Sequence, residues 1–117
     1  MIKFIRSFSY AVNGIKASLH KQVNLKVQLV TAACIIATGF YFRITSVEWC
    51  IVLLTIALVL CLEMVNTAIE SLVNLVTTEW KPLAGKVKDI AAGAVLVASV
   101  FAIFIGFIIF FKYLSLK

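Results

Sequence analysis

Three long apolar stretches, separated by short polar segments, dominate the chain. They cover residues 25–44, 49–75 and 91–111. A helix rises about 1.5 Å per residue, so about 20 apolar residues cross the ~30 Å hydrocarbon layer of a bilayer. Each stretch therefore predicts a transmembrane helix. The second stretch is longer than the layer requires, so its C-terminal part is expected to emerge at the membrane surface.

The first 21 residues follow a different pattern. Apolar side chains recur there at intervals of three and four, at Phe4, Phe8, Val12, Ile15 and Leu19. This spacing places them on one face of a helix. We therefore expect residues 1–21 to form an amphipathic helix on the membrane surface, with its basic side toward anionic headgroups. The alternative is a helix that packs against the protein's own bundle.

Polar positions are few within and between the spans. In the first span they are mild, because Gln28, Thr31 and Thr38 carry no charge. The one substantial polar segment is residues 76–90, which contains the sole proline, Pro82, and the glycine Gly85. Both residues disfavour the interior of a helix, so this segment is predicted to be a loop.

The composition agrees with a membrane protein. Of the 117 residues, 63% are hydrophobic and only 14% are charged. A soluble domain of this size cannot bury so much apolar surface. The chain is therefore predicted to be a single all-α integral membrane domain, residues 1–117. Because so small a bundle cannot enclose a large site alone, we also expect it to associate with further copies.

The net charge of +6 does not indicate nucleic-acid binding, because the basic residues flank apolar segments instead of forming a solvated patch. Basic residues beside spans mark the cytoplasmic side of a membrane. Eight fall on one side and three on the other, namely Lys3, Arg6, Lys16, Lys21, Lys26, Lys81, Lys86 and Lys88 against Arg43, Lys112 and Lys117. The N-terminus and residues 76–90 are therefore expected in the cytoplasm.

Two carboxylates lie inside the second apolar stretch. Glu63 and Glu70 are seven residues apart, and with Asn66 and Asn74 they fall on one stripe of a helical wheel. A carboxylate at the centre of a membrane span costs about 2.5–3.5 kcal/mol on insertion scales, so it usually faces a protein interior or polar cleft and marks a functional site. We expect Glu63 to lie deeper in the membrane and Glu70 nearer its surface.

Polar residues occur again just before the third span. Lys86, Lys88 and Asp89 are expected near the same membrane surface as Glu70. Carboxylates beside lysines suit a Mg²⁺-bound phosphate, since Mg²⁺ prefers oxygen ligands and ammonium groups neutralise phosphate. On these residues alone, two other interpretations stay open: polar groups that only join helices, and a proton-translocating Glu63. The chain lacks the G-x-x-x-x-G-K-[ST] motif, so a nucleotide site here differs from that of P-loop proteins.

Two segments carry a family resemblance. Residues 63–70 read EMVNTAIE, and residues 83–95 read LAGKVKDIAAGAV. With the pattern F-x-Y-A-x-x-G at residues 8–14, they resemble the prokaryotic diacylglycerol kinase family, which includes the undecaprenol kinases. The resemblance extends over nearly the whole chain.

The resemblance implies a homotrimer of three-span subunits with an N-terminal surface helix, and active sites near the cytoplasmic membrane surface. It implies transfer of the γ-phosphate of ATP to the hydroxyl of a membrane lipid alcohol, with Mg²⁺. By position, Glu63 resembles the general base and Glu70 a Mg²⁺ ligand. The residues that resemble nucleotide-contacting or site-ordering groups are Tyr10, Asn66, Lys88 and Asp89.

Two positions depart from the family pattern. Gln22 stands where the family has a glutamate that serves as a second metal ligand, and Asn74 where it has an aspartate. A neutral amide oxygen still coordinates Mg²⁺ but lacks a carboxylate's charge, so the expected metal site is weaker. A degenerate, inactive family member is therefore one alternative.

The lipid itself is harder to assign. Residues 13–16, Phe42 and residues 46–49 resemble undecaprenol kinases more than diacylglycerol kinases. We therefore expect a lipid kinase of the cytoplasmic (inner) membrane that favours undecaprenol over diacylglycerol. Alternatives from other classes are a small proton-coupled transporter centred on Glu63 and a structural assembly protein. The last leaves the cost of the two membrane carboxylates unexplained.

Overall fold

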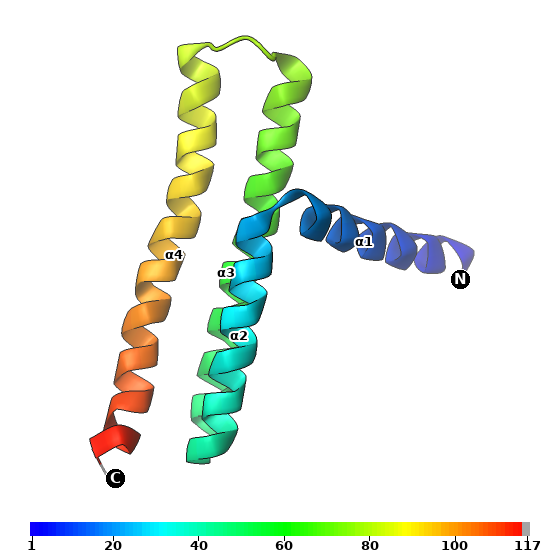
Figure 1. The fold of residues 1–117 in the computed structure, drawn as a ribbon. Helices are drawn as coiled ribbons and strands as arrows, with labels where there is room; N and C mark the ends of the chain where they lie inside the picture. Colours follow the sequence, from blue (N-terminus) through cyan, green and yellow to red (C-terminus); the bar gives the residue numbers. More distant parts are fainter. Residues whose placement is uncertain (116–117) are drawn as a thin grey trace.

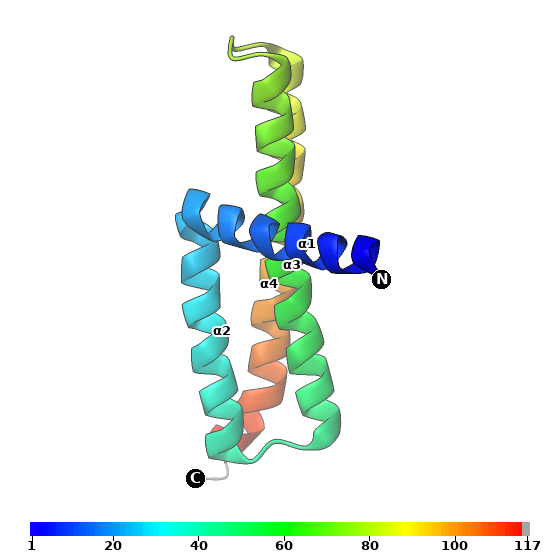
Figure 2. The same cartoon turned by 90° about the vertical axis from the view of Figure 1, so that its right-hand side faces the viewer.

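The computed structural model describes residues 1–115, which form four helices (Figure 1). These are α1 (Ile2–Lys21), α2 (Val23–Phe42), α3 (Ser46–Val76) and α4 (Pro82–Ser115). α3 and α4 form a long antiparallel hairpin, and α2 packs beside the first half of α3. α1 leaves the start of α2 and projects sideways, across the bundle axis (Figure 2). The prediction of an all-α fold is confirmed.

Three helices, α2, α3 and α4, are long and apolar enough to cross a membrane. This agrees with the three predicted spans. α3 has 31 residues and α4 has 34. At ~1.5 Å per residue, each of these helices is longer than the ~30 Å hydrocarbon layer is thick, by more than about 10 Å. Figure 2 shows where the excess lies, because the hairpin continues well past α1 on the side of the α3–α4 link.

The link between α3 and α4 is shorter than predicted. Residues 76–90 were expected to form a loop, but helix α4 resumes at Pro82. A proline fits the first position of a helix, where its missing N–H has no partner to lose. Gly85 follows without breaking the helix, and its amide donates to the carbonyl of Lys81 over 3.0 Å. A single glycine costs a helix only about 1 kcal/mol, which a 34-residue helix readily absorbs.

The turn between α2 and α3 begins with a left-handed residue. Arg43 has φ 54° and ψ 56°, and its amide donates back to the carbonyls at the end of α2. α3 then starts with a capping box, in which the Thr45 hydroxyl accepts from the amide of Glu48, and the Glu48 carboxylate accepts from the amide of Thr45. The pattern T-x-x-E in the sequence is the signal for this motif. Both ends of the turn are thus fixed locally.

The same Glu48 joins α3 to the far end of α4. Its carboxylate lies 2.6 Å from the Nζ atom of Lys112 and accepts a hydrogen bond from the Tyr113 hydroxyl. A small apolar core lies beside this cluster, formed by Ile44, Val52, Ile109 and Phe110. Ile35 and Phe42 of α2 pack against this core, so α2, α3 and α4 are joined at the end opposite the α3–α4 link. Lys117, counted above with the basic residues of this end, lies outside the described residues.

We expect the substitution Glu48→Gln to lower the melting temperature of the protein by several degrees. Glutamine removes the charge that pairs with Lys112 and weakens the capping box, which is the kind of cap whose loss measurably destabilises a helix. The change is measured by thermal unfolding in detergent. The matched control is Glu79→Gln, because Glu79 is exposed in the α3–α4 link. Equal melting temperatures for the two variants would show that the cluster adds nothing to stability.

α1 makes few contacts with the bundle. Its one buried residue is Ser18, close to its C-terminal end. The apolar side chains Phe4, Phe8 and Ile15 are exposed instead of packing on α2 or α3. An exposed apolar face on a helix that lies across the bundle axis needs a partner outside this chain.

Candidate functional site

A polar cluster lies where α1, α2 and α3 meet. Glu63 and Asn66 on α3 are buried, with 2% and 7% of their surface exposed. Glu70, two turns further along α3, is half-buried. Burial of these groups in so open a molecule sets them apart, because polar side chains are rarely buried without a role. The start of α2 and the end of α1 cover them.

Gln22 and Glu70 are brought together from opposite halves of the chain. Gln22 is the residue between α1 and α2, and its extended backbone (φ −121°, ψ 117°) turns the chain from one helix into the other. Its Nε2 atom donates to Oε2 of Glu70 over 3.0 Å. The Nδ2 atom of Asn66 approaches Oε1 of the same carboxylate at 3.5 Å. Two amides therefore hold Glu70.

Gln28 lies against Glu63, a contact that the sequence did not predict. The Nε2 atom of Gln28 donates to Oε2 of Glu63 over 3.4 Å. The only signal in the sequence was a single glutamine within a predicted span. An isolated polar residue of this kind does not by itself indicate a functional site. Three buried oxygens remain without a donor among the described residues, and they are Oε1 of Gln28, Oε1 of Glu63 and Oδ1 of Asn66.

Lysines lie on the side of the cluster nearer the α3–α4 link. The Nζ atom of Lys88 donates to Oδ1 of Asn74 over 2.7 Å, which joins α4 to α3 one turn beyond Glu70. The Nζ atom of Lys21 donates to the Ser71 hydroxyl, also over 2.7 Å. Cationic side chains therefore lie at the Glu70 end of the polar stripe on α3.

Two predicted site residues lie apart from the cluster. Tyr10 is 70% exposed on α1 and makes no side-chain hydrogen bond within residues 1–115. Asp89 is exposed and lines a shallow hollow of about 540 Å³ beside the α3–α4 link, together with Trp80 and Lys86. The chain by itself therefore brings together Glu63, Asn66, Glu70 and Gln22, while Tyr10 and Asp89 remain on its surface.

The side-chain oxygens around Glu70 are ligands that suit Mg²⁺. Among residues 1–115 no three His, Cys, Asp or Glu side chains are close enough to hold a metal ion without other ligands. Mg²⁺ in phosphate-transferring sites typically takes one or two carboxylates and completes its shell with phosphate oxygens and water. Glu70 supplies the carboxylate, and the buried Oδ1 atom of Asn66 is an oxygen still without a partner. The residues present therefore suit an ion held jointly with a phosphate ligand.

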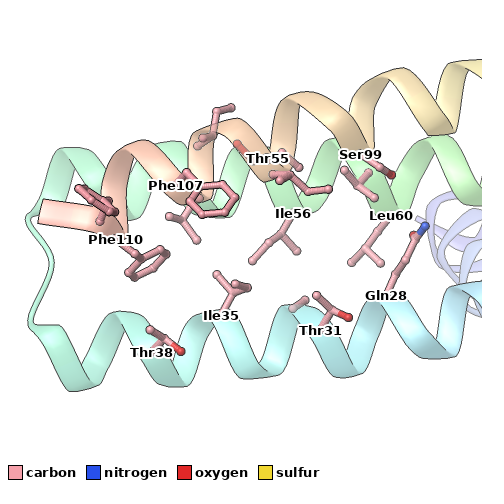
Figure 3. A pocket seen from close by; sticks show the side chains of 18 of the residues that line it. Gln28, Thr31, Ile35, Thr38, Thr55, Ile56, Leu60, Ser99, Phe107 and Phe110 are labelled. Atoms are coloured by element: carbon pink, nitrogen blue, oxygen red, sulfur yellow. The ribbon is translucent and has the colours of Figure 1, made fainter. Parts of the chain in front are cut away.

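An apolar groove of about 600 Å³ runs from this cluster toward the far end of α4 (Figure 3). It lies between α2, α3 and α4, and its lining extends from Gln28 on α2 to Phe110 and Leu114 near the C-terminal end of α4. The hydroxyls of Thr31, Thr38 and Thr55 each donate to a carbonyl of their own helix. Their polarity is thus satisfied locally, and the groove suits hydrocarbon.

Comparisons with known proteins bear on these features. Residues 9–110 match the family model described as prokaryotic diacylglycerol kinase. The chain is 38% identical over 108 residues to an undecaprenol kinase of Bacillus subtilis (strain 168), over 92% of this chain and 88% of that protein. It is 36% identical over 101 residues to a diacylglycerol kinase of Synechocystis sp., over 86% of this chain and 58% of that protein. A diacylglycerol kinase of Haemophilus influenzae is 29% identical over 108 residues, over 92% of both chains.

Proposed function

This chain belongs to the prokaryotic diacylglycerol kinase family and is thus an ATP-dependent lipid kinase, and we propose that it transfers the γ-phosphate to the primary hydroxyl of undecaprenol. The observation that carries the proposal is the stripe of buried Glu63, buried Asn66 and half-buried Glu70, which lies between an apolar groove and two lysines. A lipid kinase needs this arrangement, because its two substrates reach the reaction from the membrane and from water.

Glu63 acts as the general base. In the reaction the lipid hydroxyl gives its proton to the Glu63 carboxylate, its oxygen bonds to the γ-phosphorus, and the bond to the β–γ bridging oxygen breaks to leave ADP. The support is that Glu63 is the most deeply buried carboxylate and has one oxygen, Oε1, without a donor. The groove that starts beside it would hold the hydrocarbon chain of the lipid.

At the other end of the stripe Glu70 would hold Mg²⁺, with Gln22 as a second ligand. The ion would neutralise charge on the phosphates of bound ATP, which is the main task of a protein in phosphoryl transfer. Asn66 orders Glu70 through its amide, and Lys88 approaches the phosphates from α4. Tyr10 and Asp89 contact the nucleotide from the surface of the chain, where a neighbouring subunit can bring its site close.

The proposed assembly is a homotrimer in the cytoplasmic membrane with its N-terminus inside the cell. The wide exposure of apolar side chains on α2, α3 and α4 supports contact with lipid and with further subunits. α1 lies across the bundle axis at the level of the site, which supports a position along the membrane surface with its phenylalanines in the interface. The hairpin beyond α1 then extends into the cytoplasm, where ATP is found.

The test is transfer of label from γ-labelled ATP to lipid. Purified protein receives ATP and Mg²⁺ with undecaprenol or diacylglycerol in parallel micelles, and the lipid extract is counted. Label in undecaprenol at a kcat/KM well above that for diacylglycerol is the expected result. A preference for diacylglycerol would correct the substrate, and label in neither lipid with folding verified would favour an inactive member. A proton-coupled transporter also gives no label, but it needs a polar path, and the groove below Gln28 is apolar.

The metal dependence offers a separate prediction. We expect Gln22→Glu to lower the Mg²⁺ concentration that gives half-maximal activity, because a second carboxylate beside Glu70 strengthens a site for a hard cation. Without Mg²⁺ the two carboxylates repel each other across the 3.0 Å contact that Gln22 now bridges. The variant should therefore melt at a lower temperature than the parent protein in chelator and regain stability when Mg²⁺ is added. Unchanged metal dependence in both measurements would remove Gln22 from the metal site.

A further inference from the structure

The geometry points to a further positioning residue: we infer that Gln28 holds the Glu63 carboxylate in the orientation that accepts the proton of the lipid. The inference rests on the proposed function. Gln28 is half-buried on α2 at one end of the apolar groove (Figure 3), and its amide contacts Glu63 of the polar cluster. Its part in the site follows from its contacts.

Gln28 is the one side chain within residues 1–115 that donates a hydrogen bond to the Glu63 carboxylate. The donation, over 3.4 Å, engages Oε2 and leaves Oε1 without a partner. A buried carboxylate with no donor at all would be free to turn about its own side-chain bonds. The amide removes this freedom and leaves one oxygen open to a substrate hydroxyl, and a long hydrogen bond of this kind tightens when substrate binds.

An amide suits this task better than a charged group would. A lysine or arginine beside Glu63 would form an ion pair, which stabilises the carboxylate and makes it a poorer base. Gln28 is neutral, so it orients Glu63 without neutralising it. The choice of residue therefore agrees with a base that must take up a proton during the reaction.

The unpartnered oxygens indicate what the site receives. Oε1 of Gln28 and Oε1 of Glu63 are buried acceptors that lack a donor within the described chain. Buried acceptors are rarely left unpaired in folded proteins, so a donor from outside the chain is expected. The hydroxyl of a lipid that lies in the groove supplies one, and it enters beside Gln28 because the groove begins there.

Gln28→Met is the variant that isolates the amide, because methionine has a similar length and fills the same apolar space. A misplaced catalytic group lowers the rate by up to about 100-fold. The kcat for phosphorylation of the lipid should therefore fall by about 10- to 100-fold. The KM for ATP should stay within about two-fold, since Gln28 lies away from the phosphate end of the stripe. The control is Asn24→Leu, which removes an exposed amide one turn nearer the start of α2.

A second measurement reads the contact without activity. Dicyclohexylcarbodiimide modifies carboxyl groups in apolar surroundings, and mass spectrometry of the peptide that contains Glu63 measures its rate. Gln28→Met should raise this rate several-fold over the parent protein and over Asn24→Leu, because Glu63 loses its one donor. If the parent protein transfers label from ATP to neither lipid, the proposed function fails. The carbodiimide rates still decide whether Gln28 holds Glu63. Equal rates, or an unchanged kcat in an active enzyme, would overturn the inference.

Discussion

Glutamine in place of Glu63 is expected to reduce kcat for lipid phosphorylation by about 10²–10⁴-fold, the usual contribution of a positioned general base. Glutamine has nearly the same shape and keeps one side-chain oxygen, so the packing of α3 against α2 is preserved. It has no basic oxygen to take the hydroxyl proton. Because Glu63 lies at the end of the stripe beside Gln28 and the apolar groove, ATP binding and its Mg²⁺ dependence should change little.

The control for this experiment is Glu79→Gln, which removes an exposed carboxylate from the α3–α4 link and should leave kcat unchanged. Rates are measured with labelled ATP at saturating Mg²⁺, and thermal unfolding of both variants verifies folding. A Glu63→Gln enzyme with more than about a tenth of the parent kcat would exclude Glu63 as the base. It would then leave Glu63 as a hydrogen-bonded group that joins α3 to α2.

Glu70→Gln should cost about 10²–10³-fold in kcat/KM for ATP, the loss typical of one electrostatic partner at a charge-transfer site. The signature that separates Glu70 from Glu63 is the metal. Glu70→Gln should raise the Mg²⁺ concentration for half-maximal activity, and partial rescue is expected at high Mg²⁺. Glu63→Gln should show no such rescue.

The local structure should survive this substitution. Gln22 and Asn66 both donate to Glu70, and the amide oxygen of a glutamine at position 70 can accept one of these hydrogen bonds. The melting temperature in chelator should therefore stay close to that of the parent protein, whereas the stabilisation that Mg²⁺ and ATP together confer should be lost. A variant with reduced kcat/KM but an unchanged Mg²⁺ requirement would place the metal elsewhere.

Features of the protein that give a local and strong signal in the sequence were predicted correctly. Three long apolar runs predict three spans, and the structure has three helices long and apolar enough to cross a membrane. The family followed from the segments 63–70 and 83–95, and the match over residues 9–110 confirms it. The loop predicted at residues 76–90 is longer than the observed link, because a proline is favourable at the first position of a helix and α4 begins at Pro82.

The sequence by itself determined the helices, their apolar surfaces and the stripe of Glu63, Asn66 and Glu70, since all of these follow from the period of one helix. The tertiary structure alone decided which groups from other helices meet that stripe. Gln28 and Gln22 reach it from α2 and from the turn before α2, and Glu48 meets Lys112 and Tyr113 across 64 residues or more of chain. A periodic pattern records how a helix faces its surroundings but not which helix lies opposite, because that choice depends on packing between segments far apart in the chain.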